Sequence, residues 1–263
     1  MVFTIACRYL DNLGIHGNEN SIVCNDKKNT KKNEIKPWLS QEWCIPAGEL
    51  EEFVAAMEDI LDIYTRKHDK KRPLVCMDEV PRQLIGKVRT SIPIAKKKPA
   101  RYDTEYKRNG TCEIFMFTAP LEKWRWADAT EQRTKLDYAH QIKKLITVDF
   151  PDAEKIILVQ DNLNTHTIGS LYKAFPAEEA RILRDKLEIH YTPKHGSWLN
   201  MAEIEINVLI NHGISKRVPS IKQMKKEVAA WSKVRNKSAM KINWRFTTED
   251  ARIKLKRLYP LLY

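Results

Sequence analysis

Residues 154–166, with the sequence E-K-I-I-L-V-Q-D-N-L-N-T-H, contain the pattern that decides the fold. Positions 156–159 form an unbroken apolar run rich in β-branched residues, which predicts a strand buried on both faces of a sheet. The run stops at Gln160 and Asp161 follows, so a carboxylate stands at the carboxyl end of the strand. Ligands of open α/β sheets bind at that edge. For a lone aspartate, capping of the next helix is the simpler interpretation.

Two more acids have comparable positions. Residues 72–79, R-P-L-V-C-M-D-E, repeat the arrangement with a short apolar strand that ends at Asp78, and Glu203 lies in W-L-N-M-A-E, which is typical of a helix start. Three acids from three elements indicate a metal-dependent phosphoryl-transfer site. Such sites cluster oxygen ligands around two ions about 3.5–4 Å apart, and Mg²⁺ prefers hard oxygen donors. Repulsion between neighbouring Asp78 and Asp161 is relieved by a bound cation.

Helical periodicity leaves the third acid undecided. At about 100° per residue, the helix that follows Trp198 has one apolar stripe. The stripe consists of Leu199, Ala202, Ile206 and Leu209. Glu203 and Glu205 flank it on opposite sides at similar angles, so either could face the other acids. We expect the acid that is not a ligand to be an ordinary, partly exposed residue.

The composition indicates a soluble globule with a polyanionic partner. The chain has 263 residues, 43% of them hydrophobic, which is enough for one sizeable core. Its net charge of +12 favours nucleic acid, with an anionic membrane surface a distant second. Basicity that serves only solubility is the alternative.

Cysteine usage and the absence of long apolar stretches predict a cytoplasmic protein. The five cysteines are widely spaced, odd in number and without a C-x-x-C pair, which is typical of reduced thiols. No signal peptide is apparent, and no run approaches the roughly 18 apolar residues of a membrane helix. We therefore expect no membrane partner.

Residues 91–110 form a basic, loop-like segment with two interleaved tyrosines. Basic side chains beside aromatic rings suit a groove that follows a nucleic-acid backbone, and a solvated hairpin excursion is the alternative. Asn109-Gly110 predicts a turn, with antiparallel strands over 111–118 and 123–129 after it. The candidate DNA-binding residues are Lys96, Lys97, Lys98, Arg101, Lys107 and Arg108.

The remaining elements complete an α/β fold. Thr134 and Asp137 predict a helix start, a strand is expected over 187–191, and helices are expected near 49–64, 220–233 and 247–258. Three strands followed by alternating helices and strands predict a mixed sheet flanked by helices.

Three motifs in the same order resemble one family. They are D-E-V-P-R-Q-L at 78–84, V-Q-D-N-L-N-T-H at 159–166 and Y-T-P-K-H-G-S-W-L-N-M-A-E at 191–203. Together they look like DDE transposases of the insertion-sequence IS six-thirty group, which is related to mariner elements. The resemblance implies a ribonuclease H-like fold, and it implies that Asp78, Asp161 and Glu203 are the catalytic metal ligands, with Glu205 the runner-up.

The resemblance also implies the reaction and its partners. Water attacks a phosphodiester at the element's end, and the liberated 3′-hydroxyl attacks target DNA, with two Mg²⁺ or Mn²⁺ ions as cofactors. The partners would be transposon ends and target DNA, bound by a homodimer. Asn162, His166 and His195 are possible supporting residues, although structural hydrogen bonding explains the histidines equally well. A ribonuclease H-type nuclease and a truncated, DNA-binding remnant that inhibits full-length transposase are the alternatives.

Two departures from the family are apparent. Relatives carry helix-turn-helix segments before the catalytic domain, whereas here we expect only an N-terminal extension and basic linker over 1–36. The catalytic domain with its helical C-terminal extension is expected over 37–263. The interval between Asp161 and Glu203 is longer than usual, and we interpret the excess, residues 168–186, as a surface insertion.

Overall fold

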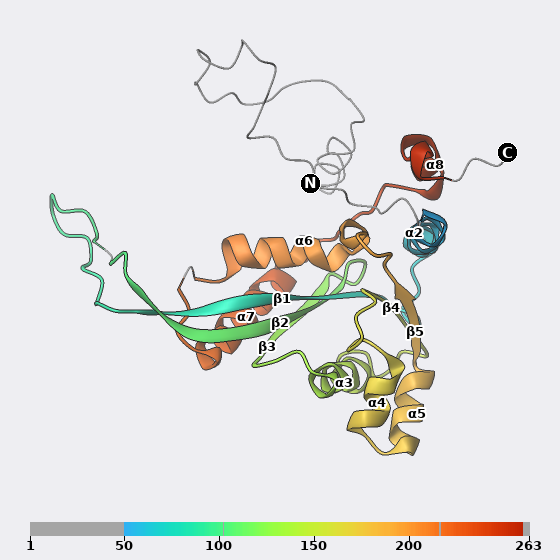
Figure 1. The fold of residues 1–263 in the computed structure, drawn as a ribbon, viewed down its shortest axis with the longest axis horizontal. Coiled ribbons are helices and arrows are strands. Elements are labelled where there is room, and N and C mark those ends of the chain that lie inside the picture. Colours follow the sequence, from blue (N-terminus) through green and yellow to red (C-terminus); the bar gives the residue numbers. More distant parts are fainter. Residues whose placement is uncertain (1–49, 102, 216, 260–263) are drawn as a thin grey trace, which may run out of the picture. The chain divides into compact units, whose positions relative to one another are not determined.

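The computed structural model describes residues 50–101, 103–215 and 217–259. The chain divides into two units, Met1–Leu50 and Glu51–Tyr263, and the second unit holds the elements below (Figure 1). The predicted extension and linker over 1–36 lie outside the described residues. No helix in the described part of the chain combines the length and apolar character that crossing a membrane requires.

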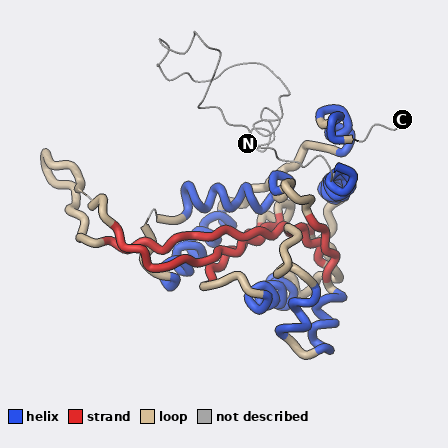
Figure 2. The backbone as a smooth tube through the Cα atoms, viewed as in Figure 1, coloured by secondary structure: helices blue, strands red, loops and turns tan. Residues whose placement is uncertain are grey.

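A mixed five-stranded sheet forms the centre of this unit, in the order β3-β2-β1-β4-β5. β1 pairs antiparallel with β2 and β2 antiparallel with β3, whereas β4 pairs parallel with β1 and β5. The strands are β1 Leu74–Lys87, β2 Tyr106–Ala119, β3 Trp124–Thr130, β4 Ile156–Gln160 and β5 Leu187–Tyr191. This confirms the predicted mixed sheet (Figure 2), and all five β4 residues are buried as their apolar run predicts.

β1 does not end at Asp78, contrary to the prediction. Its parallel pairing with β4 stops at Cys76, but its antiparallel pairing with β2 continues to Lys87. The strand therefore continues beyond its apolar run, because β2 supplies backbone hydrogen-bond partners as far as Lys87. Asp78 lies inside β1, just past the point where pairing with β4 ends.

The expected turn at Asn109-Gly110 is also absent. Both residues lie within β2, beside a register irregularity between Gln83 and Ile85 of β1, and Gly110 has φ +96°. Glycine adopts that positive φ at little cost. The bulge therefore has the same asparagine-glycine pattern that predicts a turn. The chain reverses farther out, where bridges join Ile92 to Arg101 and Ala95 to Lys98.

Seven α-helices are described: α2 Leu50–Thr65, α3 Lys135–Lys144, α4 Ile168–Ala174, α5 Ala177–Asp185, α6 Met201–Val208, α7 Ile221–Lys237 and α8 Thr248–Lys254. α3 begins with the predicted cap, because the Thr134 side chain accepts from the Asp137 backbone N–H and the Asp137 carboxylate accepts in return. Single π-helical turns, Leu145–Asp149 and Leu209–Gly213, extend α3 and α6.

The main core lies between one sheet face and α3, α4 and α5. Val75, Met77, Phe115 and Phe117 contribute the sheet side. Residues 168–186 add Leu171, Ala180 and Leu183 from α4 and α5. The surface-insertion interpretation is therefore wrong, since these helices bury apolar side chains in the core.

On the opposite sheet face α6 packs against β1 and β2, α7 packs against β3, and the Tyr64 side chain at the end of α2 reaches β1. The Tyr64 hydroxyl donates to the Leu199 carbonyl at 2.7 Å and lies 3.6 Å from the Cys76 sulfur. Cys76 and Cys112 are buried free thiols, and the other three cysteines lie outside the described residues.

Candidate active site

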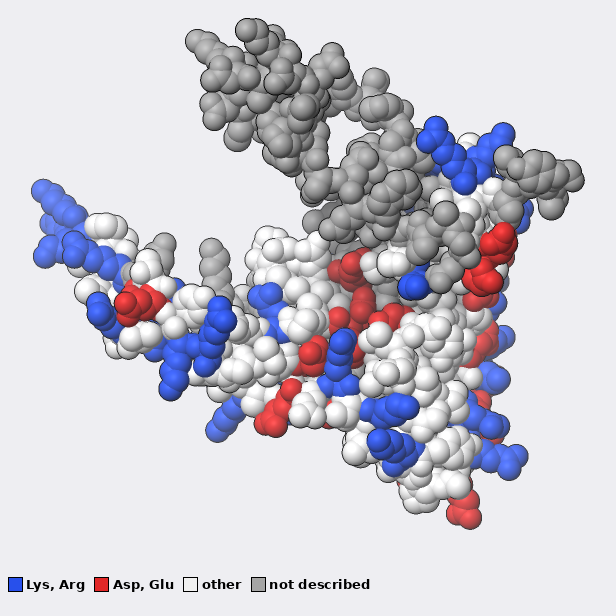
Figure 3. Space-filling model, in the orientation of Figure 1, with Lys and Arg blue, Asp and Glu red and all other residues white. Residues whose placement is uncertain are grey.

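Strand alternation separates the two neighbouring acids of β1. Val75 and Met77 face the core beside α3, so Asp78 points to the α6 side of the sheet and Glu79 to the α3 side. Asp161 follows β4 directly, at the carboxyl end of the neighbouring strand. In Figure 3, acidic side chains gather near the middle of the visible surface of the molecule.

Asn200 fixes the start of α6 against β1. Its Oδ1 caps the helix by accepting from the Ala202 backbone N–H at 3.1 Å, and its Nδ2 donates to the Met77 carbonyl at 2.8 Å. The side chain is buried. The first turn of α6, which carries Glu203, is thereby tied to the residue that precedes Asp78. Sequence reasoning missed this role, although an asparagine before a helical run is a known cap signal.

Asp78, Asp161 and Glu203 share one electrostatic neighbourhood. Burial is the largest cause that raises the pKa of Asp78, and together with the charges of Asp161, Glu203 and Glu79 it brings the pKa to about 7, against one opposing hydrogen bond from the Glu79 backbone. Burial also raises the pKa of Glu203, opposed by a hydrogen bond from the Ser197 hydroxyl. Crowded carboxylates of this kind gain from a nearby cation.

The donor set fits a hard divalent cation by its chemistry, since carboxylate oxygens are what Mg²⁺ and Mn²⁺ prefer. The side-chain positions do not form a finished chelate. Among the described residues, no three His, Cys, Asp or Glu side chains lie close enough to hold one ion together. The identity of these acids as metal ligands therefore stays a prediction.

His166 holds Asp161 in its present position. Its Nδ1 makes a short hydrogen bond with the Asp161 carboxylate, and its Nε2 lies 3.2 Å from Glu79 Oε2. Burial alone would lower the pKa of His166, but the hydrogen bonds with Asp161 and Glu79 raise it to about 9. The other two supporting candidates, Asn162 and His195, are exposed, and His195 has φ +65°.

Glu205 is buried in an ion triad, so the expectation of an ordinary, partly exposed residue is wrong. Arg235 binds its carboxylate through Nε at 2.9 Å and Nη2 at 3.2 Å. Arg125 Nη2 lies 3.0 Å from Oε1 as an ion pair but without hydrogen-bond alignment, and its guanidinium makes no hydrogen bond to a described residue. Helical periodicity could not find this, because Arg125 comes from β3 and Arg235 from α7.

The six predicted DNA-binding residues are all exposed and belong to one hairpin. Lys96, Lys97, Lys98 and Arg101 lie beyond the ends of β1 and β2, and Lys107 and Arg108 lie in β2. None of the six forms an ion pair with another residue that the structure describes. The hairpin extends from the sheet and carries basic side chains on the visible face (Figures 1 and 3).

The base of this hairpin is anchored to the segment before α7. Asn109 Nδ2 donates to the Pro219 carbonyl at 2.8 Å, and Arg217 donates to the carbonyls of Glu105 and Thr104. The segment is therefore a hairpin, as the alternative interpretation expected, and does not itself form a groove.

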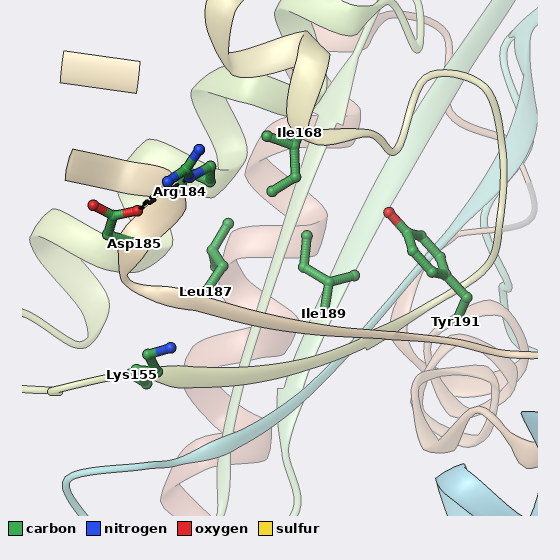
Figure 4. A pocket seen from close by; sticks show the side chains of 7 residues that line it. All are labelled: Lys155, Ile168, Arg184, Asp185, Leu187, Ile189 and Tyr191. Atoms are coloured by element: carbon green, nitrogen blue, oxygen red, sulfur yellow. Dashed lines mark hydrogen bonds and ion pairs between the residues drawn. The ribbon is translucent and has the colours of Figure 1, made fainter. Parts of the chain in front are cut away.

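A shallow groove of about 650 Å³ lies along β5, away from the hairpin (Figure 4). Ile168, Leu187 and Ile189 give it an apolar floor, with Arg184 and Asp185 paired at one end. Tyr191, at the other end, donates to the His166 carbonyl at 3.2 Å. The groove thus borders the acidic site through a single side chain.

Known proteins share both sequence and fold with this chain. Residues 73–225 match the family described as DDE superfamily endonuclease. No curated protein sequence matches significantly. A pre-cleavage Mos1 transpososome is 14% identical with a TM-score of 0.53, covering 89% of this chain and 69% of that one. The Mos1 mariner paired-end complex with Mn is 16% identical, with a TM-score of 0.52 and coverages of 87% and 64%. The Mos1 strand transfer complex is 13% identical with a TM-score of 0.51, and the match covers 89% of this chain and 68% of that one.

The Mos1 structures confirm the predicted ribonuclease H-like fold. At these identities the likeness concerns the fold alone, and this chain spans 64% of the Mos1 protein in the complex with Mn. The family match is stronger, because it covers more than half of the sequence and includes Asp78, Asp161 and Glu203. The chain therefore belongs to the DDE superfamily of endonucleases.

Proposed function

We propose that the chain is the catalytic domain of a transposase of the insertion-sequence IS six-thirty group. It would cleave DNA at the ends of an insertion sequence and join them to target DNA. One observation carries the proposal: three acids from β1, β4 and α6 crowd together on a ribonuclease H-like sheet, and the pKa of the most buried one rises to about 7. Carboxylates that crowd together and repel one another destabilise a fold, so their presence favours a role with metal.

Asp78, Asp161 and Glu203 are the residues that would hold Mg²⁺ or Mn²⁺. When bound, a pair of such ions activates the attacking oxygen and stabilises the leaving oxygen of a phosphodiester. The chain's own contribution is to anchor each carboxylate: Asp78 within a central strand, Glu203 on a helix tied to that strand by Asn200, and Asp161 by His166. Mos1 paired-end complexes are described with Mn and with Mg, which supports this choice by analogy.

DNA is the substrate that the charge distribution favours. The net charge is +12, and the hairpin presents Lys96, Lys97, Lys98, Arg101, Lys107 and Arg108 without acidic partners among the described residues. Phosphate contacts of this kind position DNA without reading its sequence. The Mos1 complexes are described as paired-end and strand transfer assemblies, so we propose that this chain also acts on DNA ends as a homodimer.

The chain's organisation belongs to the same proposal. Residues 37–263 would be the catalytic domain and residues 1–36 an N-terminal extension and basic linker.

Cleavage of supercoiled plasmid tests the function. Wild type should nick the plasmid with Mn²⁺ or Mg²⁺ and not with chelator, and pre-cleaved ends should yield strand-transfer products. Cleavage of RNA–DNA hybrids without strand transfer would support a ribonuclease H-type nuclease. DNA binding without any metal-dependent cleavage would support an inhibitory remnant.

Salt-dependent DNA binding tests the hairpin. Each phosphate contact contributes about 0.9 to the slope of log affinity against log salt. Replacing Lys96, Lys97 and Lys98 with glutamine should flatten that slope and weaken binding to unrelated sequences equally. Lys70→Gln, Lys173→Gln and Lys237→Gln together make a control of equal charge outside the hairpin. An unchanged slope in the hairpin variant would remove this segment from the interface.

A further inference from the structure

Glu79 is a buried acid that the three-acid scheme leaves without a role. Its side chain is 2% exposed and points to the sheet face opposite Asp78. One oxygen lies 3.2 Å from Arg133 Nη1 and the other 3.2 Å from His166 Nε2. Its charge also raises the pKa of Asp78, so it adds to the repulsion at the site.

The histidine between Glu79 and Asp161 is held firmly at its backbone. The His166 carbonyl accepts from Gln160 Nε2 at 2.9 Å and from the Tyr191 hydroxyl at 3.2 Å. Gln160 is positioned in turn by the Tyr138 hydroxyl at 2.9 Å, and the Tyr138 ring stacks on the imidazole with centroids 4.9 Å apart. His166 itself is fully buried.

These contacts form a chain of alternating charge, Arg133–Glu79–His166–Asp161, which runs from one sheet face to the acidic site. A buried carboxylate is costly unless its hydrogen bonds and charges are satisfied. Each oxygen of the Glu79 carboxylate has its own partner, Arg133 for one and His166 for the other. The tyrosine and glutamine fix where the imidazole lies, whereas Glu79 and Asp161 are the described residues that hydrogen-bond its two nitrogens and so set the angle of the ring.

We propose that Glu79 is a positioning residue, which acts through His166 to orient the Asp161 carboxylate toward the other two acids. The inference rests on the proposed function, since it concerns how a metal-binding carboxylate is held. With Nδ1 bound to one oxygen of Asp161, the second oxygen is left for the shared site. Without Glu79 the ring loses one of its two anchors, and the Asp161 carboxylate loses its fixed direction.

Direct Mn²⁺ binding, followed by the loss of the free-ion electron paramagnetic resonance signal, tests this without relying on catalysis. The variants are Glu79→Gln, His166→Asn and the double substitution. Asparagine keeps a donor near the position of Nδ1 but cannot reach Glu79. The matched control is Glu113→Gln, because Glu113 senses the charges of Glu79 and Arg133 but has no hydrogen bond to His166 among the described contacts. Melting temperatures of all variants identify any loss of folding.

We expect Glu79→Gln to weaken Mn²⁺ binding about tenfold or more, as partners of metal ligands typically do, while Glu113→Gln changes it less than about twofold. In the His166→Asn background, Glu79→Gln should have no further effect, because its path to Asp161 is already cut. Equal affinities in the Glu79→Gln and Glu113→Gln variants would overturn the inference. So would additive losses in the double variant, which mean that Glu79 acts by charge alone. A wild type that binds no Mn²⁺ would instead refute the proposed function.

Discussion

Glu203 and Glu205 lie two positions apart on α6 and have opposite surroundings. Glu205 is completely buried, and two arginines from β3 and α7 neutralise it. Glu203 is partly buried, adds its negative charge to that of Asp78, and accepts a hydrogen bond from Ser197 at 3.4 Å. The sequence makes the two nearly equivalent, whereas the fold makes one a compensated charge and the other a member of an acidic cluster.

The difference separates an acid that holds the structure together from an acid that the structure tolerates. A buried carboxylate with two guanidinium partners gains attraction that offsets its desolvation. The repulsion among Asp78, Asp161 and Glu203 is relieved by a bound cation. Burial alone therefore does not describe the difference between the two acids, whereas the sign of the neighbouring charges does.

The largest expected effect is on catalysis at Glu203. Glu203→Gln keeps the side-chain shape and removes a charge that the proposed metal site needs. Plasmid nicking with Mn²⁺ should fall by several orders of magnitude, while DNA affinity and the melting temperature in chelator change little. Residual nicking near the wild-type rate would exclude Glu203 as a ligand. If the soluble Glu205→Gln variant is dead while Glu203→Gln is active, the two residues have exchanged roles.

Glu205→Gln should instead destabilise the fold. Removing one partner from a buried ion group leaves uncompensated charge and costs about 3–5 kcal/mol, here from both arginines at once. Urea unfolding monitored by circular dichroism measures this, with Glu203→Gln as the isosteric control. A loss below about 0.5 kcal/mol, the range of ordinary surface substitutions, would mean that the triad contributes nothing.

The same triad offers a sharper test of its purpose. Replacing all its members together with apolar residues, as Arg125→Met, Glu205→Leu and Arg235→Met, removes every buried charge. Such replacements are often neutral or stabilising, so the triple variant should be more stable than Glu205→Gln. If the triple variant is as unstable as Glu205→Gln, the triad side chains have a packing role that methionine and leucine cannot fill.

A smaller effect is expected from pH at Asp78. Its pKa of about 7 lies above the ordinary value of 3.8. A carboxyl group shifted upward stabilises the fold fully below its unfolded pKa, and that stability is lost as pH rises through the folded pKa. In metal-free buffer, Asp78→Asn should therefore melt higher than wild type at pH 8 and similarly at pH 4, because the amide oxygen can still accept from the Glu79 backbone. The control Asp152→Asn, at an exposed position, should not raise the melting temperature at pH 8.

The smallest effect concerns Glu188, an acid whose charge is compensated and whose side chain is only partly buried. Burial opposes the shift, yet hydrogen bonds from Arg66 and Arg72 lower the pKa of Glu188 to about 2. A depressed carboxyl pKa stabilises the fold above the unfolded value and loses that contribution as pH falls from about 4.5 toward 2. At neutral pH, Glu188→Gln should cost no more than about 1 kcal/mol, since exposed ion pairs contribute little. A loss as large as that of Glu205→Gln would show that burial is not what separates them.

Most of the sheet could be predicted from local patterns. The apolar run of β4, the short β5 and the capping box at Thr134 all have signals within a few residues, and each element lies where its pattern predicts it. The end of β1 could not be found this way. It depends on β2, whose pairing continues to Lys87 after the apolar residues stop. The asparagine-glycine pattern did not predict the structure correctly, because the positive φ of Gly110 occurs here in a bulge and would equally suit a turn.

The sequence by itself determined which residue types are present and in what order: an acid after each of two buried runs, an acid in a helix after L-N, and a basic hairpin segment. Those features depend on residues close together in the chain. Only the tertiary structure showed that Glu203 and Glu205 have different surroundings, because their partners come from β1, β3 and α7, far away in sequence. It also assigned Asn200, His166 and Glu79 to the acidic site. Electrostatic interactions depend on distance in space, so a local pattern cannot reveal which charges face each other.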